Sequence, residues 1–314
     1  MQQQGLNAQA VDAWDLGLIT DSNFGAARPL GGHKADIPKR LQQLGDVIPI
    51  VTGFIAKDIN GTITTLGRNG SDLSATLFAE ALNAESCEIW SDTNGVMSCD
   101  PSLIADAQNI PAMSFREASE LARFGSRILH PASLEPVKRA SIPLRVMNTN
   151  APEHPGTLIT REVEITRESI TSIAYKESQT IVTITSPTMF QHAGFLAKVF
   201  TVLGRHHVIV DMISTSEVSL SFSTEKTPQL EHAQYELAEL GRCEVVSDKT
   251  IIAIVAPSRN HFLRNDVDVF SVLQANKIET EMLSLGYQSN NLMLLIDDSQ
   301  IKKAVTALHD AFFT

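Results

Sequence analysis

The segment TLGRNGSDLSA, residues 65–75, combines residue types that could bind a small charged molecule. Two glycines flank Arg68, and glycine lets the backbone adopt positive φ or approach a ligand closely. A helix beginning at Ser71 and Asp72 would direct unpaired N–H groups and a positive dipole end at an anion. Arg68 suits a carboxylate or phosphate, and Asp72 suits an ammonium group. The segment therefore predicts either such a binding site or an ordinary strand–turn–helix connection in which Ser71 caps the helix.

Short apolar runs and helical patterns alternate on either side of this segment, over the first half of the chain. IPIVTGFIA (48–56) is typical of a buried strand that ends in a glycine-bearing loop. Residues 71–84 predict a helix, and CEIWSD (87–92) predicts the strand that follows it. Ser114 and Glu117 have the spacing of a capping box at the start of another helix. This alternation predicts a mostly parallel sheet covered on both faces.

The second half of the chain has a different pattern, which begins after the proline-rich stretch APEHPGT (151–157). The similar strands TIVTITSP (180–187) and TIIAIVAP (250–257) start two units about 70 residues apart. Each unit continues into a helix and a further strand, as in ferredoxin-like βαββαβ domains. We expect helices at 193–206, 268–276 and 299–312, and strands at 208–216 and 291–297.

Composition excludes several functional classes. Thirty-six acidic and 25 basic residues give a net charge of −11, which disfavours nucleic-acid binding because no basic patch offsets it. No membrane span or signal peptide is visible, so we expect a cytoplasmic protein without membrane contact. Cys87, Cys99 and Cys243 lack metal-type spacing and predict reduced, partly buried thiols.

The histidines do not indicate a metal site. The adjacent His206 and His207 cannot both face one metal from a regular element, so we interpret them as a helix C-terminus stabilised by charge. His130 is interpreted as a hydrogen-bonded turn residue. We expect no metal held by the protein.

Four segments resemble aspartate kinases of the amino-acid kinase family and occur in the family's order. The segments are VTGFIAKDINGTITTLGRNGSD, IWSDTNGVMSCDP, FREASELARFGSRILHPASLEP and GFLAKVFTVLGRHHVIVDMISTSEVS, the last being similar to the lysine-inhibited class. The resemblance implies an α/β fold, with a partial three-layer αβα amino-acid kinase domain at 1–163. Two ferredoxin-like ACT domains, at 164–247 and 248–314, would follow it, and residues 170–178 would supply a strand to the second.

The reaction implied by the resemblance is transfer of the γ-phosphoryl group of ATP to the side-chain carboxylate of L-aspartate. Its product, 4-phospho-L-aspartate, leads to lysine, threonine and methionine, and Mg²⁺ would arrive on the ATP phosphates. By resemblance, Arg68 would bind the α-carboxylate of aspartate, and Ser71 and Asp72 would complete the amino-acid pocket. The residues implied to contact the nucleotide are Ser91, Asp92, Gly95 and Arg127.

The chain departs from the family pattern in two respects. The family usually has tyrosine near Met97, arginine at Ser102, lysine at Arg127 and glycine at Asn69. The family's opening Lys-Phe-Gly-Gly-Thr segment, whose lysine neutralises the transferring phosphoryl group, has no counterpart in this sequence, so we expect an N-terminally truncated catalytic domain and assign no catalytic residue. Two hypotheses remain: an aspartate kinase, or a non-catalytic lysine-sensing regulatory chain or truncated remnant.

The ACT resemblance also implies feedback by L-lysine and a homodimer formed through the ACT domains. Asp211 and Glu217 could pair with the ammonium groups of the effector, whereas Phe195, Leu196 and Val210 could equally be plain packing residues. The implied lysine-binding residues are Met189, Gly194, Phe195, Leu196, Val210, Asp211, Thr215, Ser216 and Glu217.

Overall fold

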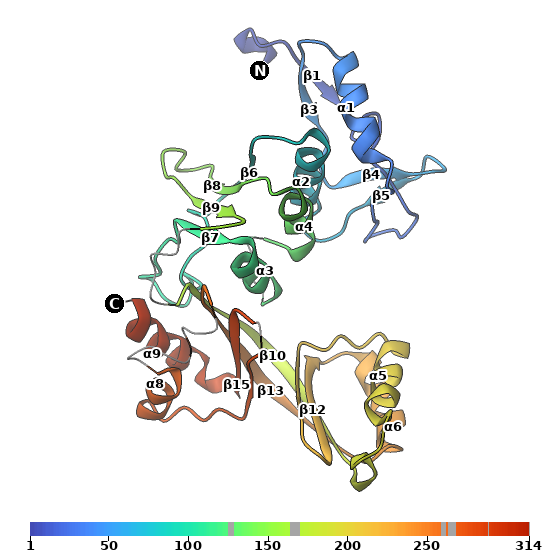
Figure 1. The fold of residues 1–314 in the computed structure, drawn as a ribbon. Coiled ribbons are helices and arrows are strands. Elements are labelled where there is room, and N and C mark those ends of the chain that lie inside the picture. Colours follow the sequence, from blue (N-terminus) through green and yellow to red (C-terminus); the bar gives the residue numbers. More distant parts are fainter. Residues whose placement is uncertain (125–128, 164–169, 259–261, 263–267, 288, 314) are drawn as a thin grey trace. The chain divides into compact units, whose positions relative to one another are not determined.

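The chain folds into two compact units in the computed structural model (Figure 1). The structure describes residues 1–124, 129–163, 170–258, 262, 268–287 and 289–313. Unit 1 comprises Met1–Met97 and Asn109–Ile165, and unit 2 comprises Ser98–Gln108 and Thr166–Thr314. The segment Ser98–Gln108, assigned to the first domain in the sequence analysis, therefore groups with the second half of the chain.

The described residues of unit 1 form three small sheets rather than one continuous sheet. β1 (Ala8–Val11) pairs with β3 (Ile48–Val51), and the second sheet has the order β2 (Ile19–Thr20), β4 (Ile55–Asp58), β5 (Ile63–Thr65). The third has the order β6 (Cys87–Ser91), β8 (Leu144–Asn148), β9 (Thr157–Thr160), β7 (Ala112–Ser114). Four of the six strand pairs in the described part of unit 1 are parallel, in agreement with the mostly parallel pairing expected. The helices are α1 (His33–Gln43), α2 (Gly70–Leu82), α3 (Phe115–Arg123) and α4 (Pro131–Ala140).

The strand predicted within 48–56 and the glycine-bearing loop that ends it are confirmed as β3 and the residues around Gly53, but the strand is not buried. The segment forms β3 and β4, because Phe54 adopts φ 71° and turns the chain between them. Ile48 and Ile50 of β3 are 42% and 46% exposed, since alternate residues of this strand face away from the core.

Two helix predictions in unit 1 are confirmed, with one correction. The helix expected at 71–84 is α2, but its N-cap is Asn69, with φ 54°, and no side chain caps it. The interpretation of Ser71 as a cap is therefore wrong, because the helix starts one residue earlier, at Gly70. In α3 the capping box is complete: Ser114 Oγ accepts from the Glu117 N–H at 3.3 Å, and Glu117 Oε2 accepts from the Ser114 N–H at 2.8 Å.

Unit 2 is built on one antiparallel sheet that both repeat units share (Figure 1). Its strand order is β11 (Met212–Thr215), β12 (Ser219–Glu225), β10 (Ser172–Thr185), β13 (Arg242–Val255), β15 (Asn291–Asp297), β14 (Met282–Ser284). The long strands β10 and β13 serve both halves: Ser172–Lys176 pair with Ile251–Val255, and the later part of β10 pairs with β12. The helices are α5 (Phe195–Arg205), α6 (Pro228–Ala238), α8 (Val269–Ala275) and α9 (Ile301–Phe313).

The predicted helices at 193–206, 268–276 and 299–312 are confirmed as α5, α8 and α9, and the strand at 291–297 is β15. The strand expected at 208–216 is shorter, since only Met212–Thr215 pair with β12.

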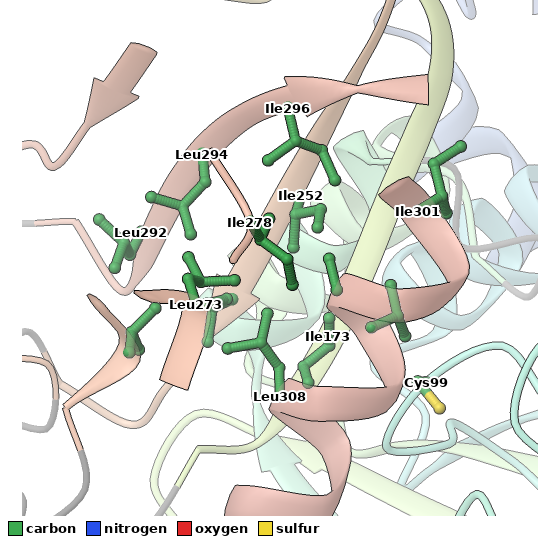
Figure 2. Close-up of a cluster of buried hydrophobic side chains, with 14 of the residues drawn as sticks. Cys99, Ile173, Ile252, Leu273, Ile278, Leu292, Leu294, Ile296, Ile301 and Leu308 are labelled. Atoms are coloured by element: carbon green, nitrogen blue, oxygen red, sulfur yellow. The ribbon is translucent and has the colours of Figure 1, made fainter. Parts of the chain in front are cut away.

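Each half of unit 2 has its own hydrophobic core. One core packs α5 and α6 against β10 and β12, around the fully buried Phe222. The other packs α8 and α9 against β13 and β15, and Figure 2 shows Leu308, Ile252 and Leu294 meeting there. Cys99, from the segment Ser98–Gln108, joins this second core, which explains why that segment belongs to unit 2.

Candidate functional site

The N-terminus of α2 is fixed by the turn at residues 52–54. The Phe54 N–H donates to Ser74 Oγ at 3.0 Å, and that hydroxyl donates to the Gly70 carbonyl at 2.9 Å. A Cβ on Gly70 would lie 2.7 Å from Phe54 Cδ2, so only glycine fits beneath this ring. The first turn of α2 therefore has a well-defined position in unit 1.

Arg68 and Asp72 flank the start of α2 and differ in their hydrogen bonding. Asp72 accepts hydrogen bonds from Asn69 Nδ2 at 3.2 Å and from Ser71 Oγ at 3.3 Å, which orient its carboxylate. Arg68 is exposed, and its guanidinium has no hydrogen bond or ion pair with the residues that the structure describes. The geometry thus offers an oriented carboxylate and an unengaged cation four residues apart.

The N-terminus of α4 lies beside that of α2. His130 is hydrogen-bonded as expected, since its Nδ1 accepts from the Ala132 N–H at 3.2 Å, but it is the extended N-cap of α4 and not a turn residue. In the first turn of α4, Ser133 Oγ donates to the Asn69 carbonyl at 3.5 Å. Two positive helix ends therefore converge at Asn69, which favours an anion there.

Glu80 holds together the helices that carry this site. Its carboxylate accepts from Arg139 of α4 at 2.7 and 2.8 Å, and from Lys34 of α1 at 2.6 Å. The Glu80 side chain is only 5% exposed. The Arg139 hydrogen bond is the main cause that lowers the pKa of Glu80, against the opposite effect of burial. A charged carboxylate therefore links α1, α2 and α4.

A second candidate region lies where the parallel strands β6 and β8 end. Ser91 and Asn148 are paired at the carboxyl ends of these strands, a common position for ligands in α/β sheets. Ser91 Oγ accepts from the Thr93 N–H at 3.1 Å, and Asn148 Nδ2 donates to Asn94 Oδ1 at 2.6 Å. The predicted residues Ser91 and Asp92 thus begin a loop that is tied to the neighbouring strand.

Gly95 occupies the tightest point of this loop. It has φ 94°, and a Cβ there would lie 2.5 Å from Thr157 Oγ1 and 2.7 Å from Thr157 N. Thr157 Oγ1 accepts from the Val96 N–H at 2.8 Å and donates to the Ile110 carbonyl at 2.6 Å. Glycine is therefore required by the protein's own packing, whatever ligand the loop binds.

The remaining predicted nucleotide residue, Arg127, lies outside the described residues. Ser102 falls in unit 2, where its hydroxyl donates to Asp100 Oδ1 at 2.6 Å. The residues that fix the loop escaped prediction because no local pattern links them: Asn94 within the loop, Asn109, Asn148 of β8 and Thr157 of β9.

The predicted lysine-binding residues separate into two groups along the β11–β12 hairpin. Ser216 and Glu217 lie at its turn, where the Ser216 N–H donates to the Ser219 carbonyl at 2.8 Å. Asp211 lies at the opposite end, where its N–H donates to the Ser223 carbonyl at 3.0 Å. Because the register runs from Met212 with Ser223 to Thr215 with Leu220, one protomer does not bring these carboxylates together.

The other predicted lysine-binding residues differ in burial. Phe195 is 4% exposed in the core of the first half of unit 2, and Met189 and Val210 pack partly against that core. Leu196 is 38% exposed. Gly194, the N-cap of α5, has φ 91° and open space where a Cβ would lie. The packing interpretation therefore holds for Phe195.

A cavity of about 270 Å³ opens at the Asp211 end of the hairpin. Lys176, which is not among the predicted lysine-binding residues, donates from its Nζ to Asp211 Oδ2 at 2.6 Å, and both residues line the cavity. The cavity is lined by Lys176, His207, Ile209, Asp211, Thr224, Glu225, Thr227 and Gln229.

The histidine pair ends α5, as predicted. His206 Nε2 lies 2.7 Å from Glu236 Oε1, and Arg205 donates to the other oxygen of Glu236 at 2.6 Å. The His206 hydrogen bond is the main cause that lowers the pKa of Glu236. Within the described ranges, no group of three or more His, Cys, Asp or Glu side chains is arranged to hold a metal, and no helix has the length and apolar character to cross a membrane.

Each half of the chain matches the model of a known protein family. The model of the amino acid kinase family matches residues 1–148, and an ACT domain model matches residues 182–234 and 267–312. Aspartokinase 3, chloroplastic, from Arabidopsis thaliana is 36% identical over 325 residues, which cover 98% of this chain and 57% of that protein. The chain spans 56% to 59% of the length of three Arabidopsis aspartokinases.

Solved structures agree with this result. Escherichia coli aspartokinase III in complex with aspartate and ADP matches with a TM-score of 0.88 and 33% identity, covering 100% of this chain and 71% of that one. The same enzyme in complex with lysine and aspartate gives a TM-score of 0.79. The lysine-sensitive aspartokinase 3 of E. coli is 34% identical over 323 residues, which cover all of this chain and 71% of that protein. The predicted fold class is thereby confirmed, and the chain belongs to the aspartokinase family.

Proposed function

We propose that the protein takes part in ATP-dependent phosphorylation of the side-chain carboxylate of L-aspartate, with lysine feedback through its ACT domains. The observation that carries the proposal is the convergence of the α2 and α4 N-termini at Asn69, beside the unengaged Arg68. These positive groups suit the α-carboxylate of aspartate, and the oriented Asp72 suits its ammonium group. E. coli aspartokinase III, which this chain resembles, has been crystallised with aspartate and ADP.

The nucleotide is assigned to the loop after β6. Ser91 ends β6 beside the end of the parallel strand β8, and Asp92 follows it. Mg²⁺ carried by the ATP phosphates would neutralise charge between two anionic reactants. The residues described here would bind and orient the reactants, because phosphoryl transfer of this kind depends chiefly on positioning and charge neutralisation.

Aspartyl hydroxamate formation with ATP and aspartate tests this proposal directly. Replacement of Arg68 by methionine keeps the aliphatic stem and removes the charge. Loss of its charge-assisted hydrogen bonds should lower kcat/KM for aspartate roughly 10- to 150-fold, while KM for ATP stays near the wild-type value. Glu85→Gln, an exposed charge change just after α2, is the matched control and should leave kcat/KM unaltered.

The alternative is a non-catalytic chain that senses lysine. The two hydrophobic cores among the described residues of unit 2 are consistent with it, because each ACT half has a core of its own. A wild-type protein that gives no hydroxamate above the blank, yet gains thermal stability with millimolar L-lysine, would support this alternative over the kinase proposal. A protein with neither property would contradict both.

A homodimer through the ACT domains is also part of the proposal. β11 is an outer strand of the sheet, and Ile209 and Ile213 beside and within it are 76% and 41% exposed. Apolar side chains at a sheet edge suit contact with a second copy. Light scattering during size-exclusion chromatography should give twice the mass of the chain. The cytoplasmic location stays a prediction from the sequence.

A further inference from the structure

Lys176 bridges two carboxylates that come from different strands. Its Nζ lies 2.6 Å from Asp211 Oδ2, just before β11, and 3.0 Å from Glu225 Oε1 at the end of β12. An irregularity in the β10–β13 register between Lys176 and Gln179 interrupts the strand next to these acids. The side chains of Lys176 and Asp211 are 22% and 18% exposed, whereas that of Glu225 is 64% exposed.

The charge state of Lys176 is set by these partners. Burial alone would lower the pKa of its ammonium, but the hydrogen bonds to Asp211 and Glu225 outweigh that effect and raise the pKa. Lys176 is therefore a cation at neutral pH. Without it, two like charges would face each other with no compensating cation from this strand.

The cavity beside this ion triad is accessible to a small solute. Lys176, Asp211 and Glu225 form its charged side, and Ile209 provides an aliphatic wall. Thr227 and Gln229 add hydrogen-bonding groups. A free amino acid with an ammonium at the end of an aliphatic side chain would suit a cavity with carboxylates, an aliphatic wall and hydrogen-bonding groups. Its side-chain ammonium would approach the Asp211 carboxylate, which already pairs with Lys176.

We propose that Lys176 competes with the effector for the same carboxylates. Its ammonium pairs with Asp211 and Glu225, and the side-chain ammonium of a lysine-like effector displaces it. Lys176 thereby sets the affinity of this ACT site and its selectivity for cationic amino acids. The inference rests on the proposed lysine feedback. Of the lysine-binding residues that the family resemblance implies, this cavity shares Asp211 alone, and Lys176 is a further residue beside it.

The second half of unit 2 provides a matched internal control. Lys249 donates to Glu281 at 2.5 Å and to Asp297 at 3.3 Å. The Glu281 N–H donates to the Leu295 carbonyl in the same way that the Asp211 N–H donates to Ser223, so the two acid pairs occupy corresponding places. None of Lys249, Glu281 and Asp297 lines the cavity.

Calorimetric titration of the full chain with L-lysine and with L-norleucine tests the inference. Norleucine has the same aliphatic stem as lysine and lacks the side-chain ammonium. Lys176→Met should tighten L-lysine binding at least about tenfold, because displacement of a charged hydrogen-bonding group is no longer required. Norleucine affinity should not change. Lys249→Met should alter L-lysine affinity by less than about twofold.

Three outcomes would overturn the inference. If the wild type binds L-lysine and Lys176→Met binds it equally or more weakly, the competitor role is wrong while lysine feedback stands. If Lys249→Met tightens binding as much, the effect is not specific to this cavity. If neither the wild type nor Lys176→Met binds L-lysine, the proposed feedback itself fails. Lys176→Gln repeats the test should the methionine variant unfold, and Lys176→Arg, which keeps a cation, should bind L-lysine within about twofold of wild type.

Discussion

Glu80 is the most informative single residue for testing how the aspartate pocket is positioned. Its carboxylate joins α2 to α4 through Arg139 and to α1 through Lys34. Glu80→Gln keeps the size of the side chain and removes its charge. We expect the variant to lower the free energy of unfolding of unit 1 and to loosen the two helix N-termini that meet at Asn69.

The magnitude follows from three charge-assisted hydrogen bonds on one carboxylate. Such bonds contribute about 1.5–3 kcal/mol each when both partners are buried. Here the carboxylate is 5% exposed, but Arg139 and Lys34 are 57% and 47% exposed, so solvent screens the attraction. We therefore expect a total loss of about 2 kcal/mol, which corresponds to a decrease in Tm of roughly 4–8 °C for a unit of this size.

The loss should depend on pH with a definite sign. The pKa of Glu80 is lowered in the folded protein from its ordinary value of 4.5. Its stabilisation is therefore complete well above the unfolded pKa and disappears as the pH falls through the folded pKa. The difference in unfolding free energy between wild type and Glu80→Gln should be largest near neutral pH and should shrink in acid.

Tryptophan fluorescence during urea unfolding isolates the relevant unit. The only two tryptophans of the chain, Trp14 and Trp90, both lie in unit 1. Glu135→Gln is the control, since Glu135 pairs with Lys138 on the same helix but both side chains are well exposed, so its loss should stay below about 0.5 kcal/mol. Equal losses for the two variants, or a Glu80→Gln loss that does not change with pH, would refute the reasoning.

Two further predictions concern the loop after β6 and the thiols. Gly95→Ala should destabilise unit 1 by at least about 2 kcal/mol in the same assay, because a Cβ at φ 94° would meet Thr157 at 2.5 Å; an unchanged midpoint would contradict this packing. Iodoacetamide should label the half-buried Cys243 before the buried Cys87 and Cys99, whose thiol pKa burial raises to about 11, and peptide mass mapping would reveal any other order.

The sequence predicted the elements that have strong local signals. β15 matches its apolar run, and α3 matches its capping box, because neighbouring residues determine both. α6 escaped prediction even though Thr227 and Pro228 form a recognisable helix start, with Thr227 Oγ1 accepting from the Leu230 N–H. Its polar composition gives only a weak apolar stripe, which explains the omission.

The sequence could not predict the contacts that organise the candidate sites. Lys176 and Asp211 are 35 residues apart, and Glu80 and Arg139 are 59 apart. Neither pair has a spacing that local periodicity can detect, since strand register and helix packing bring the partners together. The family resemblance implied a role for Asp211 but not for Lys176. A motif match identifies the residues of the motif, and it does not identify the residues that contact them in the folded chain.

The loop after β6 leads directly into unit 2 without a linker. Met97 still pairs with Asn109 in unit 1, and the next residue, Ser98, is fully buried in unit 2. There its carbonyl accepts from the Ile173 N–H at 2.7 Å, and its hydroxyl lies 3.0 Å from His309 Nε2 in α9. The predicted nucleotide loop therefore ends at a residue held by a strand and a helix of the ACT half.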